Sequence, residues 1–119
     1  MGLIFKICGE EEWRTAERQG VYRGSAVDER DGFIHFSTAA QLAETAARYF
    51  ASRHDLLLIA VEAEALGAAL RFEPSRGGAL FPHLYGALPL SAVSFVDAMP
   101  VGADGSHRLP SPQRLQSQP

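Results

Sequence analysis

Apolar positions along the chain fall into short runs that predict strands, and two amphipathic segments between them predict helices. The run Leu56–Val61 is continuous, which is typical of a central strand covered on both faces. Further strands are predicted at Leu3–Ile7, Gly32–Ser37, Leu70–Glu73 and Ala92–Met99. Because the later strands lack crossover helices, this order favours an α+β fold over a doubly wound one.

Both predicted helices carry recognisable start signals. The first has three glutamates at 10–12 in its first turn, places Trp13 and Ala16 in the core and ends at Gly20. The second begins at Thr38, where Gln41 three residues later completes a capping-box pattern. Its predicted apolar face consists of Leu42, Ala46, Tyr49 and Phe50.

The remaining segments have few apolar anchors. Residues 22–30 form a polar connection, and residues 74–80 a loop with paired glycines. A Pro-containing loop follows at residues 81–86. We therefore expect one globular domain at residues 1–102 and a loosely ordered C-terminal tail at residues 103–119.

Composition limits the classes of function. A chain of 119 residues has room for one hydrophobic core, and its net charge of -3 makes a nucleic-acid partner unlikely. Its single cysteine, Cys8, excludes an internal disulfide. We see no export signal or membrane-spanning run, so we expect a cytoplasmic protein without a membrane partner.

His35 is the first candidate for chemistry. Alternation along the strand puts Phe33, His35 and Ser37 on one face, and the helix that starts at Thr38 would bring free backbone N–H groups close to an anion. A hydrogen-bonded interior histidine is an equally good interpretation of His35.

His83 is the second candidate, because a loop histidine flanked by Phe81 and Tyr85 has few packing duties. Pro82 and Gly86 could equally serve only to shape a turn. Two histidines beside aromatic residues in so small a chain predict one shared small-molecule pocket.

Two charged residues could complete that pocket. Glu73 could act as a general base or hold a ribose hydroxyl, although a salt bridge to Arg71 or Arg76 is the simpler interpretation. Arg76, followed by two glycines, could bring its guanidinium to a phosphate. The segment matches no Walker or dinucleotide-binding fingerprint.

Metal and nucleophile chemistry find little support. Cys8, His35 and His83 include no pair at the spacing typical of zinc ligands, so we expect no metal. Gly24-Ser25 is not a nucleophile elbow, and Cys8 has no neighbouring base.

The segments Gly32–Thr38 and Phe81–Gly86, with Gln41, Tyr49, Phe50 and Glu73, resemble domain-of-unknown-function family 952. More remotely, this family resembles the ADP-ribosyltransferase superfamily, which includes RNA 2′-phosphotransferases. That resemblance implies two small sheets with two main helices around a cleft that binds NAD. The chain departs from the superfamily pattern at Phe5-Lys6, where a histidine commonly holds the ribose, and at residues 86–89, which lack the usual glutamate.

The resemblance implies an uncharacterised protein with a nucleotide-binding cleft for NAD or an ADP-ribose-like ligand. Its reaction would be glycosidic transfer or hydrolysis at the nicotinamide ribose, with His35, His83 and Glu73 as catalytic residues. The ligand would contact Phe33, Ser37, Thr38, Arg76, Phe81 and Tyr85. The alternatives are a non-catalytic ligand-binding module on the same fold and a protein-interaction module.

Overall fold

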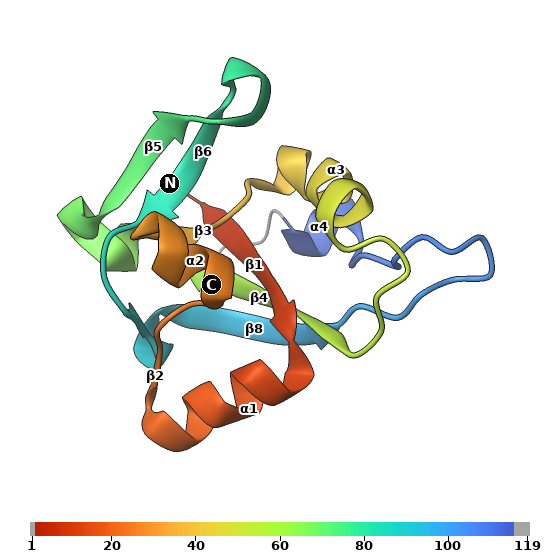
Figure 1. Cartoon of the computed structure of the whole chain (residues 1–119), viewed down its shortest axis with the longest axis horizontal. Helices are drawn as coiled ribbons and strands as arrows, with labels where there is room; N and C mark the ends of the chain where they lie inside the picture. The colour runs from red at the N-terminus through yellow and green to blue at the C-terminus, as the bar shows by residue number, and fades with distance from the viewer. Residues whose placement is uncertain (1, 116–119) are drawn as a thin grey trace.

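In residues 2–115, which the computed structural model describes, the strands form three antiparallel sheets (Figure 1). The strands are β1 (Leu3–Gly9), β2 (Val21–Tyr22), β3 (Ile34–His35), β4 (Leu56–Glu62), β5 (Leu70–Pro74), β6 (Leu80–Leu84), β7 (Leu88–Pro89) and β8 (Val93–Ala98). The α-helices are α1 (Glu10–Gln19), α2 (Ala26–Asp31), α3 (Ala39–Tyr49) and α4 (Pro112–Leu115). Short 3-10 helices are η1 (Ala63–Ala69), η2 (Arg76–Gly78) and η3 (Leu90–Ala92). The α+β class is confirmed, but the strands form three sheets instead of the two that the resemblance implies, because β2 and β7 pair separately.

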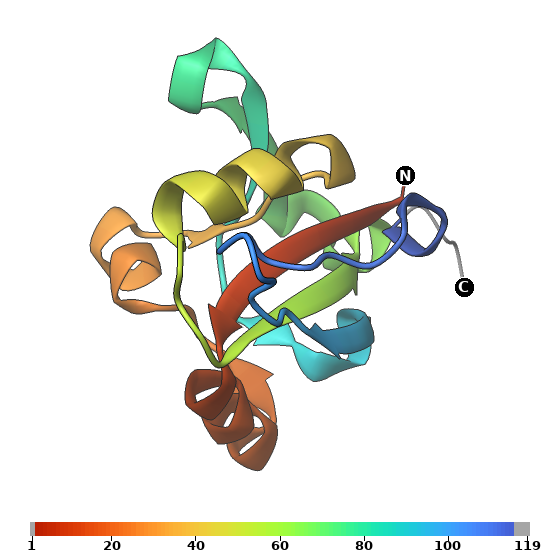
Figure 2. The same ribbon diagram turned by 90° about the vertical axis from the view of Figure 1, so that its right-hand side faces the viewer.

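The largest sheet has the order β1-β4-β8, so the continuous apolar run forms its central strand as predicted. Alternation along β4 divides its side chains between two cores. Leu56, Leu58 and Ala60 pack on the side of α3, whereas Leu57 and Ile59 pack on the side of α1. Figure 2 shows α3 (yellow) above β1 (red), and α1 at the lower end of the same strand. Both faces of the sheet are therefore covered.

Both predicted helices are confirmed. Gly20 ends α1 in the left-handed region at φ 82°, a conformation that favours glycine. At the start of α3 the Thr38 N–H donates to Gln41 Oε1 at 3.0 Å, as the capping-box pattern predicts. Tyr49 differs from its predicted place in the core, because its ring lies against Arg76 and is 58% exposed. Within residues 2–115 no helix combines the length and apolar character needed to cross a bilayer.

Two segments predicted as loops are regular structure. The connection at residues 22–30 contains the start of α2, because Ser25 forms a capping box with Asp28. The segment at residues 81–86 lies largely in β6, the middle strand of the sheet β3-β6-β5. Pro82 fits there because its C=O accepts from the Phe36 N–H on the side away from β5, so β5 needs no N–H from it.

The sheet containing β6 meets β1 at a single-residue bridge. The strand predicted at Gly32–Ser37 is reduced to Ile34–His35, and the chain then runs past the outer edge of β1. There Phe5 and Ser37 exchange two backbone hydrogen bonds, each 2.8 Å long. This bridge places β3 and β6 beside the open edge of the central sheet.

The first part of the predicted tail lies against the sheet. Val101 pairs with His107, and the Arg114 guanidinium contacts the Asp97 carboxylate at 2.9 and 3.1 Å. Leu109 and Leu115 pack against the core on the α3 side. Residues 116–119 of the predicted tail lie outside the described residues.

Candidate functional site

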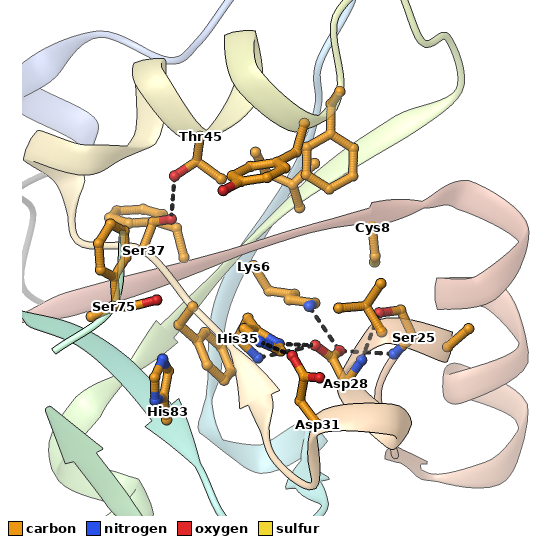
Figure 3. Close-up of a pocket in the computed structure, with 18 of the residues that line it drawn as sticks. Lys6, Cys8, Ser25, Asp28, Asp31, His35, Ser37, Thr45, Ser75 and His83 are labelled. Carbon is orange, nitrogen blue, oxygen red and sulfur yellow. Dashed lines mark hydrogen bonds and ion pairs between the residues drawn. The ribbon is translucent and has the colours of Figure 1, made fainter. Parts of the chain in front are cut away.

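A cavity of about 660 Å³ lies along the outer edge of β1. Its walls come from β1, α2, β3, α3, the segment after β5, and β6. This volume is in the range of small-molecule sites in proteins. Figure 3 shows that polar side chains from several of these elements point into the same space.

Lys6 brings a buried positive charge to the cavity. Alternation along β1 turns its side chain to the same face as Ile4 and Cys8, where it is only 8% exposed. Its Nζ lies 2.8 Å from Oδ2 of Asp28, whose side chain is 2% exposed. Burial alone would raise the pKa of Asp28, but the hydrogen bond from His35 and the charge of Lys6 hold that pKa far below its usual range. The pair is therefore ionised on both sides.

His35 is held between two carboxylates, as the dashed lines in Figure 3 indicate. Its Nδ1 lies 2.7 Å from Asp28 Oδ1, and its Nε2 lies 3.0 Å from Asp31 Oδ2. A neutral imidazole has one N–H, so only the protonated ring donates to both carboxylates. This cluster, Lys6–Asp28–His35–Asp31, is closed in the sense that both ring nitrogens of its histidine are occupied.

His83 has a different environment, although its ring centroid is 5.6 Å from that of His35. Its Nδ1 lies 2.8 Å from Glu73 Oε1, which also accepts from the Tyr85 hydroxyl at 2.7 Å. These hydrogen bonds, first from Tyr85 and then from His83, lower the pKa of Glu73. Phe33 stacks on the His83 ring with centroids 4.0 Å apart. Among residues 2–115 no hydrogen-bond partner is found for His83 Nε2.

Arg76 lies on the wall of the cavity between two aromatic rings. Its guanidinium carbon is 4.6 Å from the Phe81 centroid and 5.4 Å from that of Tyr49. One terminal nitrogen donates to Thr45 Oγ1 at 3.2 Å, and Thr45 contacts the Ser37 hydroxyl at 2.9 Å. The same nitrogen lies 4.0 Å from Oε1 of the exposed Glu44, and the side chain of Arg76 is 15% exposed. Most of its five N–H groups are therefore not used by the described protein atoms.

The predicted site residues fall into two groups. The structure brings five of them to the cavity wall: His35, Ser37, Arg76, Phe81 and His83. The others do not line it: Phe33, Thr38, Glu73 and Tyr85. Phe33 and Glu73 contact His83 directly, Tyr85 contacts both of them, and the three form a second layer behind His83. The first turn of α3 does not reach the cavity either, so its backbone N–H groups are not available there.

Sequence reasoning missed the acidic side of the site. Asp28, Asp31 and Thr45 were not among the predicted residues, and Lys6 was noted only as a departure from a family pattern. For Asp28 a local signal exists, because Ser25 and Asp28 have the spacing of a capping box. The spacing of Lys6 and Asp28, which lie on different elements, carries no such signal.

The described residues 2–115 offer neither a reactive thiolate nor a cluster of metal ligands. Burial, followed by the charge of Glu12, raises the pKa of Cys8 to about 12, so its thiol stays protonated. Within residues 2–115 no three His, Cys, Asp or Glu side chains are grouped as metal ligands would be.

The chain matches, over residues 7–96, a family described as proteins of unknown function, DUF952. That match spans most of the chain. The chain belongs to the DUF952 family. The matched range contains Asp28, Asp31 and His35 of the closed cluster, together with β5 and β6. Lys6 lies one residue before it.

Solved structures support this membership of the DUF952 family. The crystal structure of protein CC0527 from Caulobacter crescentus has 50% sequence identity and a TM-score of 0.86, with 89% of this chain and 93% of that chain covered. The solution NMR structure of CC0527 has 51% identity and a TM-score of 0.81, with coverages of 89% and 91%. No curated protein matches the chain. This chain and CC0527 thus share a fold. Neither the family name nor the name CC0527 states an activity.

Proposed function

We propose that this protein binds a small anionic ligand of the nucleotide class in the cavity beside β1. The observation that carries the proposal is Arg76. A guanidinium held between Phe81 and Tyr49, with most of its N–H groups unused, is a donor set for a phosphate or carboxylate. The hydroxyls of Ser37 and Thr45 lie beside it and add further hydrogen-bonding capacity.

The open edge of β1 adds a second type of recognition. Phe5 directs its N–H and C=O outward to Ser37, and backbone groups two residues apart in a strand point to the same side. Ile7 therefore turns its N–H and C=O toward the cavity that it lines. A donor beside an acceptor pairs with a carboxamide or with the edge of a nucleobase.

NAD and ADP-ribose are the first ligands to test. The sequence resemblance to ADP-ribosyltransferases favours them, and they combine phosphates with an amide or base edge. Aromatic surface for a ring is available on Tyr49 and Phe81. Lys6, at the position where that superfamily commonly has histidine, is engaged by Asp28, so ribose recognition would have to come from other groups.

Binding is the primary proposal, and glycosidic transfer or hydrolysis of NAD is the second candidate. The closed cluster favours this order, because both ring nitrogens of His35 already contact carboxylates. Asp28 accepts from His35, Lys6 and Ser25 and has little capacity left to stabilise a positive transition state.

Thermal unfolding with added ligand tests the proposal. A ligand present at 100 times its Kd stabilises the folded state by roughly 2.7 kcal/mol, which is several degrees for a chain of this size. We expect NAD, ADP-ribose or AMP at millimolar concentration to raise the Tm. No shift with any of these compounds would contradict the proposal.

Two arginine variants localise the effect. Arg76→Met removes the guanidinium in the cavity and should abolish the ligand-dependent shift. Arg14→Met is the matched control, because Arg14 is an exposed residue of α1 that pairs with Glu10 and Glu17 and does not line the cavity. Equal shifts in the two variants would exclude Arg76 as the anion-binding group.

A further inference from the structure

The environment of His83 extends the proposed function from binding to chemistry. An ionised Glu73 can only accept hydrogen bonds, so the Nδ1 of His83 at 2.8 Å must carry the proton. In the neutral ring Nε2 then holds the lone pair. His83 lines the cavity and its Nε2 has no partner in the described part of the chain. A carboxylate that fixes the tautomer of an imidazole is the arrangement of a general base.

Packing also fixes the orientation of this ring. Phe33 stacks on one face with centroids 4.0 Å apart, and the His83 side chain is 5% exposed. The Tyr85 hydroxyl donates to the same oxygen of Glu73 at 2.7 Å, which holds the carboxylate in place. Glu73 does not line the cavity, so it acts through His83 as a positioning residue.

The neighbour of His83 decides which atom of a ligand the base would face. Phe81 and His83 are two residues apart on β6, so their side chains share a face at a spacing of roughly 7 Å. Arg76 lies on the Phe81 ring. Arg76 and His83 both line the cavity, so an anion held by Arg76 would share that space with the His83 ring.

Resting on the proposed ligand class, we propose that His83 is a general base that activates water for hydrolysis of a phosphoester or phosphoanhydride bound by Arg76. Nε2 accepts one proton of the water, whose oxygen forms a bond to phosphorus. The P–O bond to the leaving group breaks, and the leaving oxygen keeps its electron pair and takes a proton from solvent. Proton loss from His83 to solvent completes the cycle without a redox change.

The tautomer of His83 tests the geometry without any ligand. Long-range proton–nitrogen NMR on the full chain, at a pH where the ring is neutral, should show the proton on Nδ1. Glu73→Gln should allow both tautomers, because an amide can donate as well as accept, and Glu73→Asp should partly restore the original signature. A wild-type ring protonated on Nε2 would overturn the inference.

Incubation with ADP-ribose in oxygen-18 water tests the reaction. We expect AMP and ribose 5-phosphate, with the heavy oxygen in one phosphate by phosphorus NMR. His83→Gln should lower the rate by about 100-fold or more, the usual contribution of a general base. Glu73→Gln should lower it by a smaller factor with an unchanged KM, and Arg14→Met should match the wild type.

The outcomes separate this inference from the proposed function. A Tm shift with ADP-ribose but no isotope in either phosphate would overturn hydrolysis and leave binding intact. Nicotinamide release from NAD with the isotope on the ribose would overturn attack at phosphorus in favour of glycosidic cleavage. Absence of both binding and turnover would overturn the two proposals together.

Discussion

His35 and His83 face each other in register across two paired strands, yet the fold uses them in opposite ways. His35 gives both ring nitrogens to carboxylates from α2. His83, which lines the cavity, has a hydrogen bond from Nδ1 to Glu73 and no partner for Nε2 among the described residues. The difference arises from the number of carboxylates within reach of each ring.

This contrast shows that the role of a histidine in a cavity depends on whether both of its ring nitrogens already have partners in the protein. Both ring nitrogens of His35 contact carboxylates of the protein itself. The ring of His83 is oriented by the protein, but only its Nδ1 has a hydrogen-bond partner in the described part of the chain. This difference is the reason that His83, and not His35, is the proposed general base.

The largest expected effect comes from opening the closed cluster. Asp28→Ala leaves the ammonium of Lys6 buried without its partner, which should lower the free energy of unfolding by about 3–5 kcal/mol. Urea denaturation measures this loss. Asp31→Ala is the matched control on the same helix, and because Asp31 is one-third exposed we expect only a small part of that loss. Equal losses would contradict a closed cluster.

Acid should weaken the same cluster by a smaller amount, because protonated Asp28 still fills its place. The pKa of Asp28 is lower in the folded chain than its ordinary value near 3.9. Its contribution to stability is therefore complete above about pH 5 and is lost as the pH falls toward the folded-state pKa. Denaturation between pH 6 and pH 2 should show this decline, and Asp28→Asn should flatten it. An unchanged slope in Asp28→Asn would assign the acid sensitivity to other carboxylates.

Replacing each histidine by glutamine compares the two environments directly. His35→Gln removes a donor from buried Asp28 and should cost about 1–3 kcal/mol of stability. His83→Gln loses a hydrogen bond to partly exposed Glu73 and the stacking on Phe33, so we expect about 1 kcal/mol. Chemical denaturation of both variants gives the order. The reverse order would place the structural histidine at position 83.

The smallest effect is expected from Tyr85→Phe, which removes one of two hydrogen bonds to Glu73 Oε1. Tyr85 is 40% exposed, so water replaces the hydroxyl and stability should fall by roughly 0.5 kcal/mol. Its loss should also raise the pKa of Glu73 toward the ordinary value, because that hydrogen bond is the main cause of the lowering. Carboxylate NMR titration checks the direction, and an unchanged pKa would contradict it.

The sequence predicts the parts of the fold that depend on local patterns. The continuous run Leu56–Val61 and the Thr38–Gln41 capping box each contain their own signal. β6 escaped prediction because Pro82 is normally excluded from a middle strand, and only the register with β5 shows why it fits. Likewise α2 has too few apolar residues to show a helical period.

For the candidate site, the residues that sit beside aromatic neighbours in sequence could be named in advance, as His35 and His83 were. Their roles could not. Asp28 meets Lys6 from a different element, and Glu73 reaches His83 only through the antiparallel pairing of β5 with β6. Such partners are set by tertiary packing, which leaves no spacing rule in a single chain.

The bridge between Phe5 and Ser37 has a mechanical consequence. Two short backbone bonds join the central sheet to the sheet that carries both imidazoles, and the cavity lies along this seam. A seam held in this way is a natural place for local opening, which amide exchange at these two residues would report. Transient breaking of these two hydrogen bonds would then change the width of the cavity, and hence the size of the molecule that can enter it.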